Sequence, residues 1–270
     1  TLAKRNYALY LFILPAFLYI LIFHYWPLYG IQLAFKDYIP NKGIWGSPWV
    51  GFKYFKQFFS SYRFSQLIKN TLAISLYSLV AGFPMPIILA LILNYTKNYR
   101  LKKFAQTATY APHFISTVVM VSMVYIFLSP RTGIINTFIE FLGGEPKYFM
   151  GIPSHFRHIY VWSGIWQGTG WGSIIYIATL SGVDPELHEA AVIDGASKLR
   201  RIWHIDIPSI MPTAIILLIL NMGSIMNIGF EKVLLMQNDL TLEVSEVIST
   251  YVYKMGILNA QYSYSTAVGL

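Results

Sequence analysis

Five long apolar runs constrain the fold of this chain more than any other feature of its sequence. A helix of about 20 apolar residues crosses the ~30 Å hydrocarbon core of a bilayer, and each run is long enough to do so. The runs lie at about residues 7–35, 70–94, 104–128, 159–180 and 209–235, and a sixth begins near residue 262 and is incomplete at residue 270. This pattern predicts an all-α polytopic membrane protein with about six spans, folded as a single transmembrane domain over residues 1–270.

Composition agrees with this fold class, because 55% of the residues are hydrophobic and only 12% are charged. Soluble domains carry about 25% charged residues. Prolines lie inside several runs, including Pro15, Pro84, Pro86 and Pro112. A proline removes one helical hydrogen bond, so each predicts a kink that neighbouring helices and water must stabilise.

The two ends of the sequence indicate a longer natural protein. Leu270 ends an apolar segment that has only begun and has no polar flank, and the chain starts at Thr1 in place of an initiator methionine. The first run is too long for the core of a cleavable signal peptide and lacks a clear small-x-small cleavage site. We therefore expect it to be a retained span.

Basic residues near the spans bear on orientation, because cytoplasmic loops of membrane proteins are enriched in Lys and Arg. With the N-terminus in the cytoplasm, the inside segments contain Lys4, Arg5, Lys97, Arg100, Lys102, Lys103, Lys198, Arg200 and Arg201. The outside segments hold slightly more basic residues but are roughly twice as long. The density of basic residues, and not their number, therefore favours this orientation. We expect a cytoplasmic N-terminus.

The sequence contains no recognisable catalytic or metal site. No Gly-Lys dipeptide exists, so there is no phosphate-binding P-loop, and no cysteine is present. His188-Glu189 begins a zinc-protease pattern, but Val192 stands where the second histidine is needed. The net charge of +8 is spread over membrane loops. That distribution favours anionic lipid headgroups of the bilayer over nucleic acid as a partner.

The loop at residues 182–208 looks soluble although it lies between two apolar runs. Asp184, Pro185 and Glu186 form a helix-start pattern of cap, preset φ and acid in the first turn, and Gly195 provides a stop. The predicted helix of about nine residues would be marginal alone, because isolated helices shorter than roughly 12 residues rarely persist in water. It therefore needs a surface on which to dock.

A second short helix is expected to follow, with Ser197 as its cap, before Pro208 ends the segment. Its apolar side would face the membrane domain through Leu199, Ile202, Trp203 and Ile205. In the first helix, Ala190 and Ala191 allow close approach, and Glu186, Glu189 and Asp194 offer carboxylates to a partner. The alternative is an amphipathic segment that lies on the inner leaflet without a protein partner.

Glu189-Ala190-Ala191, Gly195 and Ile205-x-Ile207-Pro208, at this spacing, resemble the EAA motif. That motif belongs to permease subunits of type I, binding-protein-dependent ABC importers. Ile207 departs mildly from the leucine that is usual in the family. The residues from Gly223 through Phe230-Glu231-Lys232-Val233 to Gln261-Tyr262-Ser263-Tyr264 also resemble the LplB-like branch of the sugar permeases. The resemblance covers essentially the whole chain.

The resemblance implies a transport subunit without its own ATPase site in the cytoplasmic (inner) membrane of a bacterium. Its implied partners are a second permease subunit of different sequence, an extracytoplasmic solute-binding protein and two ATPase subunits, which bind ATP and magnesium. This chain itself would hold no cofactor. The motif residues Glu189, Ala190, Ala191 and Gly195 would dock on an ATPase, with Asp194 shaping the end of the helix and Pro208 framing the segment.

The translocation path is expected where polar groups lie inside the spans, because each unpaired group in hydrocarbon is costly. Asn221, Ser224 and Asn227 recur every three residues and would share one face of the fifth span. We expect that face to line the cavity. The alternative is that these side chains form hydrogen bonds between helices.

Aromatic and polar residues of the third and fourth spans are further candidates. Trp166, Gln167 and Trp171 combine flat apolar faces with hydrogen-bonding groups, which suits a sugar. Tyr110 and His113 flank Pro112, where a kink could expose them to the cavity. The alternatives are an interfacial aromatic belt for the tryptophans and ordinary packing for His113.

These features favour a carbohydrate as the transported solute. The LplB-like branch implies an oligosaccharide, with an alginate or other uronate type as the finer expectation. An importer for a peptide, an amino acid or phosphate is the main alternative. A secondary transporter is disfavoured, because such proteins use intramembrane ionisable residues that these spans almost lack. The aromatic segment at residues 36–63 suits contact with the binding protein or an interfacial position.

Overall fold

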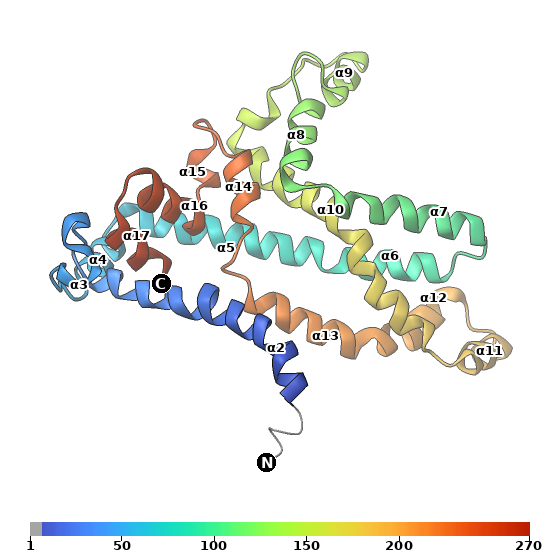
Figure 1. The fold of residues 1–270 in the computed structure, drawn as a ribbon. Helices are drawn as coiled ribbons and strands as arrows, with labels where there is room; N and C mark the ends of the chain where they lie inside the picture. The colour runs from blue at the N-terminus through green and yellow to red at the C-terminus, as the bar shows by residue number, and fades with distance from the viewer. Residues whose placement is uncertain (1–6) are drawn as a thin grey trace. The chain divides into compact units, whose positions relative to one another are not determined.

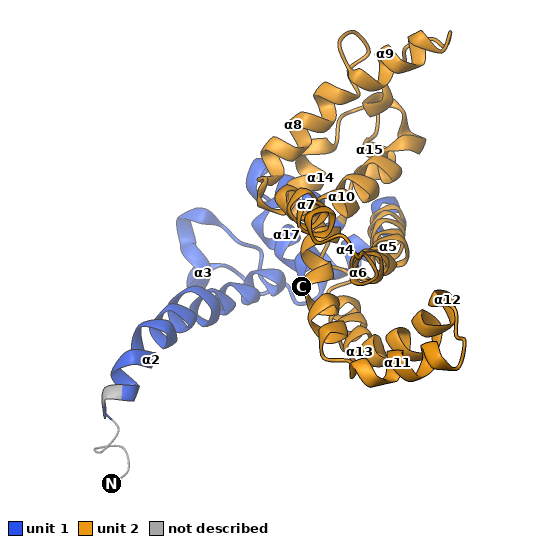
Figure 2. Cartoon of the chain, turned by 90° about the vertical axis from the view of Figure 1, so that its right-hand side faces the viewer, with its two compact units in different colours: residues 1–65, 248–270 blue, residues 66–247 orange. Residues whose placement is uncertain are grey.

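The computed structural model describes residues 7–270, so Lys4 and Arg5 of the expected inside segments lie outside the described residues. The described part is helical, apart from loops and one isolated β-bridge between Lys36 and Trp49. The chain divides into two compact units, one of residues 1–65 with 248–270 and one of residues 66–247 (Figure 2). The predicted all-α fold class is confirmed.

The first unit brings together segments that are far apart in the sequence. The backbone N–H of Tyr38 donates to the hydroxyl of Ser263 at 2.9 Å, and the rings of Tyr54 and Phe58 lie 6.4 and 6.5 Å from that of Tyr264. Its helices are α2 (Tyr7–Ile20), a π-helical turn (Leu21–Tyr25), a 3-10 segment (Trp26–Phe35), α3 (Gly43–Gly46), α4 (Lys53–Phe59), α16 (Ile248–Tyr253), a second π-helical turn (Lys254–Leu258) and α17 (Tyr262–Gly269).

The segment at residues 36–63 is folded back on itself within this unit. Lys36 is buried, donates to the carbonyl of Ile44 at 2.7 Å and lies over the ring of Trp49. Tyr54 donates to the carboxylate of Asp37 at 2.6 Å, and Lys53 lies 3.2 Å from it. These hydrogen bonds hold the pKa of Asp37 below its ordinary value. The segment is therefore an ordered part of the first unit, held by its own hydrogen bonds and ion pair.

The second unit is organised around α10 (Pro153–Ser181), a helix of 29 residues. It packs against α6, α7, α13, α14 and α15, and Figure 1 shows it crossing the line of α5 and α6. The other helices are α5 (Tyr62–Gly82), α6 (Pro84–Asn94), α7 (Tyr99–Tyr110), α8 (Thr117–Phe127), α9 (Ile134–Phe141), α11 (Pro185–Ile193), α12 (Lys198–Arg201), α13 (Ile207–Gly223), α14 (Phe230–Met236) and α15 (Leu242–Ser245).

Three helical segments among the described residues are long and apolar enough to cross a membrane: Leu9–Phe35, Tyr62–Asn94 and Lys198–Gly223. The second begins well before the predicted residue 70, because the polar first turns of α5 continue the same helix. The fourth run lies inside α10, whose glycines, tryptophans and polar residues make it less apolar than the others.

The third run is broken rather than kinked. Tyr99–Phe114 and Thr117–Phe127 are helical segments that meet at an angle of 105°. Pro112 cannot donate a helical hydrogen bond, and the Ser116 hydroxyl accepts from the backbone of Val119 to begin α8 afresh.

The fifth run, predicted as one helix over 209–235, is also broken. α13 ends at Gly223 and α14 begins at Phe230. The side chains of Asn221 and Ser224 donate to the carbonyls of Leu217 and Asn221, at 2.8 and 3.0 Å. Side chains that bond to nearby backbone in this way compete with helix continuation. The prediction of a single helix is therefore wrong.

The contact between α10 and α7 depends on Gly170. A Cβ atom there would lie 1.9 Å from the carbonyl oxygen of Thr109, whereas one at Gly168 would meet nothing within 4 Å. We expect Gly170→Ala to force the two helices apart, at a cost of about 1–3 kcal/mol. Gly168→Ala on the same helix is the matched control.

The measurement is the thermal midpoint of the detergent-purified protein, followed by size-exclusion chromatography after heating. A lowered midpoint for Gly170→Ala and an unchanged one for Gly168→Ala are expected. Equal midpoints would contradict the close packing of α7 on α10.

Candidate functional site

The predicted short helix is present as α11, with the predicted cap and stop. The Asp184 carboxylate accepts from the backbone N–H of Glu186 at 3.0 Å. At the other end Gly195 has φ +76°, a conformation that favours glycine. The N–H of Ala196 donates to Ala191 and that of Gly195 to Val192, which together form a Schellman motif. Both ends of the helix are therefore defined by its own residues.

The outer face of α11 is accessible in this chain. Glu189 and Ala190 are exposed, and Ala191 is half-buried. Ile193, at the end of the helix, is 85% exposed. α11 lies at an edge of the second unit (Figure 1). An exposed helix with apolar and acidic side chains and two rigid ends has the properties of a docking element.

A buried polar cluster connects α11 to the rest of the unit, and sequence reasoning missed it. Asp206 is fully buried and accepts a hydrogen bond from the hydroxyl of Tyr95 at 2.7 Å. The Nε2 atom of His188 lies 3.4 Å from its other oxygen. Arg201 lies over the ring of Tyr95 at 5.6 Å. Asp206 thus joins α11 and the end of α6 to the start of α13.

The chemistry of this cluster follows from burial. Burial and the hydrogen bond to Asp206 raise the pKa of Tyr95 to about 12, so the phenol is a donor at neutral pH. A buried carboxylate is costly unless it is paired and hydrogen-bonded. The sequence offered one signal for this cluster, the acidic residue Asp206 in an otherwise apolar segment just before Pro208. Its partner Tyr95 is 111 residues away in the sequence, so the pairing could not be predicted.

The second helix of the loop begins as predicted but does not end at Pro208. The Ser197 hydroxyl accepts from the backbone N–H of Arg200 at 3.4 Å. The helix then runs from Lys198 to Gly223 through a π-helical turn at Ile202–Asp206. Pro208 therefore lies inside a continuous helix, where the wider π-helical turn before it accommodates the proline ring. The expectation that Pro208 ends the segment is wrong.

The expected apolar side of this helix is only partly correct. Ile202 and Ile205 are half-buried, but Leu199 is 77% exposed and Trp203 is 68% exposed. The π-helical turn rotates successive side chains relative to a regular helix, which separates these four residues. Leu199 and Trp203 therefore do not pack on the membrane domain of this chain.

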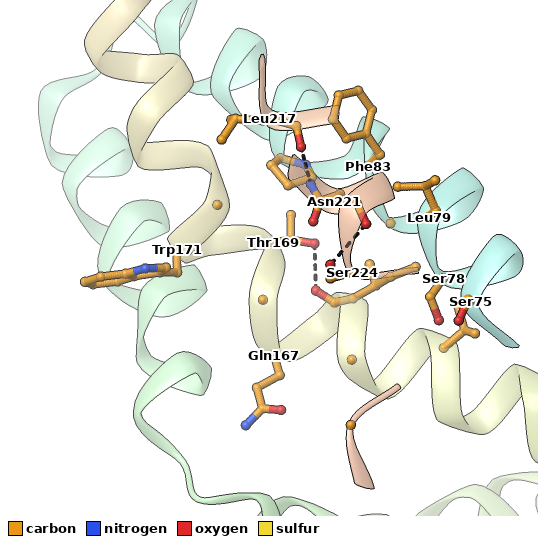
Figure 3. Close-up of a pocket in the computed structure, with 18 of the residues that line it drawn as sticks. Ser75, Ser78, Leu79, Phe83, Gln167, Thr169, Trp171, Leu217, Asn221 and Ser224 are labelled. Carbon is orange, nitrogen blue, oxygen red and sulfur yellow. Dashed lines mark hydrogen bonds between the residues drawn. The ribbon is translucent and has the colours of Figure 1, made fainter. Parts of the chain in front are cut away.

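A cavity of about 990 Å³ lies within the second unit, lined by α5, α6, α10, α13, α14 and the break between α13 and α14. Five predicted path residues line it: Gln167, Trp171, Asn221, Ser224 and Asn227. Figure 3 shows Thr169, Asn221 and Ser224 among the side chains that line it. Ser224 and Asn227 lie beyond the end of α13, so the three residues do not share a helical face. The break, not a helix face, brings them to the cavity.

The other predicted path residues do not line the cavity. The ring of His113 stacks on that of Trp171, with centroids 4.5 Å apart and planes 3° from parallel, so it supports a lining residue. Trp166 is half-exposed and Tyr110 is half-buried, and neither is among the lining side chains.

The lining of the cavity is mostly apolar, with hydroxyl and amide groups set among the apolar side chains and one charged residue. Hydroxyl and amide groups come from Ser75, Ser78, Gln167, Thr169, Asn221, Ser224 and Asn227. Lys232 is the single charged residue, and no Asp or Glu is among the lining residues. The described residues contain no cluster of His, Cys, Asp and Glu that could hold a metal. This lining can bind hydroxyl groups and apolar ring faces, and it can compensate negative charge.

Comparison with known proteins places these features in a family. Residues 82–270 match the family model "Binding-protein-dependent transport system inner membrane component". Protein LplB of Bacillus subtilis (strain 168) is 48% identical over 267 residues, which is 99% of this chain and 84% of LplB. The polygalacturonan/rhamnogalacturonan transport system permease protein YteP of the same organism is 47% identical, over 100% of this chain and 84% of YteP.

A solved structure is also similar over nearly the whole chain. It is the crystal structure of a bacterial ABC transporter involved in the import of the acidic polysaccharide alginate, with a TM-score of 0.92 and 42% identity, covering 99% of this chain and 90% of that chain. The same transporter type has been solved with a periplasmic protein that holds an alginate pentasaccharide, at a TM-score of 0.91. The chain described here belongs to the family of inner membrane components of binding-protein-dependent transport systems.

Proposed function

We propose that this chain forms half of the translocation path of an ATP-driven importer for an acidic oligosaccharide of the uronate type. The observation that carries the proposal is the cavity, whose lining offers hydroxyl and amide groups, aromatic rings and one ammonium without any carboxylate. Sugar hydroxyls require hydrogen-bonding partners, and the apolar faces of sugar rings suit aromatic side chains. The relatives named for polygalacturonan and alginate transport carry acidic sugars, which agrees with this lining.

The proposal includes the other components of the importer. A solute-binding protein outside the membrane delivers the sugar, a second permease subunit of different sequence forms the other half of the path, and two ATPase subunits bind ATP and magnesium. Glu189, Ala190, Ala191 and Gly195 on α11 dock on an ATPase, with Asp194 closing the helix. The exposure of α11 and its defined ends support this assignment.

The orientation follows from the same docking. If α11 meets an ATPase, the loop at 182–208 is cytoplasmic. The hydrogen bond from Tyr95 to Asp206 supports the same side for the end of α6 and for the basic cluster from Lys97 to Lys103 that follows it. An N-terminus in the cytoplasm is consistent with both.

The substrate class is tested in vesicles that contain the complete importer, its binding protein and internal ATP. We expect ATP-dependent uptake of a galacturonate or alginate oligosaccharide. A neutral maltodextrin of the same length is the control and is expected to enter poorly. Uptake of maltodextrin with no response to either uronate oligosaccharide would overturn the proposed substrate.

The docking surface is tested by Glu189→Lys and Gly195→Asp. The first reverses a charge on the exposed face, and the second places a side chain where φ is +76°, which strains the end of α11. Both variants are expected to insert normally but to lose most of the ATPase subunit during purification. Glu140→Lys, on the exposed face of α9, is the matched control and is expected to retain it. Normal co-purification and uptake of the two α11 variants would exclude α11 as the docking element.

The buried cluster around Asp206 is tested by Tyr95→Phe, Asp206→Asn and the double variant. Losing a hydrogen bond to a buried charge costs about 1.5–3 kcal/mol. We expect each single variant to lower the amount of sugar transported per ATP hydrolysed, because α11 is then held less firmly to α6 and α13. The double variant should be no worse than Asp206→Asn, since the two residues form one interaction. Additive losses would show that they act separately.

A further inference from the structure

Lys232 is a buried cation that has no counter-ion among residues 7–270. It lies in α14, is 9% exposed and lines the cavity. Its Nζ atom donates to the carbonyl of Tyr160 at 2.7 Å and lies 4.5 Å from the centroid of the Tyr160 ring. No ion pair between Lys232 and an acidic residue is formed within the described part of the chain. Its neighbour Glu231 is exposed.

The energetics make this arrangement unusual. Removing an ammonium from water is costly unless it is paired, and a charged residue inside a membrane protein usually serves a substrate or ion path. A carbonyl and a ring face compensate only part of that cost. An ammonium has three N–H donors, and the carbonyl of Tyr160 uses one of them. Within the described residues, the others have no protein acceptor and belong to a side chain that lines the cavity.

The surroundings keep space for the ammonium. A Cβ atom at Gly164 would lie 3.0 Å from Nζ, so a larger residue there would displace it. Gln167 is one turn further along α10, on the same side, and also lines the cavity. The break between α13 and α14 contributes Asn227 to the lining of the same cavity. The cavity thus combines a cation with neutral hydrogen-bonding residues that can bind sugar hydroxyls.

We propose that Lys232 binds a carboxylate of the transported sugar and makes this half of the path selective for anionic saccharides. The proposal rests on the proposed function and assigns its charge preference to one residue. The Nε2 atom of Gln167 donates to the carbonyl of Ile115 at 2.8 Å, so its amide oxygen remains to accept from a hydroxyl of the sugar. Tyr160 holds the ammonium in place when no sugar is bound.

The test uses the complete importer in vesicles, with saturating binding protein that carries a galacturonate oligosaccharide. We expect Lys232→Gln to lower the uptake rate at least about tenfold, the range for losing one charge-assisted hydrogen bond. Lys232→Arg keeps the charge and is expected to retain much of the uptake. Lys147→Gln removes an exposed lysine and serves as the matched control.

A purely structural role is distinguished by a second measurement, the thermal midpoint of the detergent-purified complex. A galacturonate trisaccharide should raise the midpoint of the unaltered complex more than its carboxyl-reduced, neutral counterpart does. That difference should disappear in Lys232→Gln. Equal stabilisation by both sugars in the unaltered complex would overturn the role of Lys232, even if Lys232→Gln assembles poorly.

The two proposals fail in different ways. If the unaltered importer does not take up uronate oligosaccharides, the proposed function is wrong. If it does, and Lys232→Gln takes them up at the same rate, only the assignment of Lys232 is wrong.

Discussion

The backbone must satisfy its own hydrogen bonds wherever the chain crosses hydrocarbon, and the rest of this structure depends on that constraint. A continuous helix meets the requirement, and any interruption needs side chains to replace the lost bonds. The two interruptions in the second unit do so, through the Ser116 cap at one and through Asn221 and Ser224 at the other. The second interruption also lines the cavity. Asn221 and Ser224 therefore do both: they bond to the backbone at the break, and they line the cavity where a solute can contact them.

A second constraint is the rigidity of the loop that carries α11. A short exposed helix transmits movement only if its ends are defined and its base is attached. The Asp184 cap and the Schellman motif at Gly195 define the ends. The buried carboxylate of Asp206, at the start of α13, accepts from Tyr95 at the end of α6 and lies 3.4 Å from His188 of α11. Displacement of α11 would therefore be passed to helices that line the cavity. This is a physical route between the proposed docking surface on α11 and the cavity.

Local features of the sequence predicted local structure well. The cap at Asp184, the stop at Gly195 and the cap at Ser197 depend on residues a few positions apart, and each was confirmed. Features that depend on distant partners were not predictable in this way. The hydrogen bond between Tyr95 and Asp206, the stacking of His113 on Trp171 and the burial of Lys232 against Tyr160 join residues from different helices. Asn221, Ser224 and Asn227 do line one cavity, but the predicted reason, a shared helical face, is wrong. Hydropathy cannot distinguish a continuous helix from one that is interrupted by six residues of similar polarity.

The pairing of Tyr38 with Ser263 has a consequence for biosynthesis. The two residues are 225 positions apart, so the ribosome makes the first long before the second. During that interval the segment at 7–65 lacks the helices α16 and α17 that complete its compact unit, while the intervening unit at 66–247 can pack as it emerges. Contacts between such distant segments form slowly, because a long loop must close first. The first unit is therefore expected to mature after the second, and an incompletely folded first unit is what a quality-control protease would find during that interval.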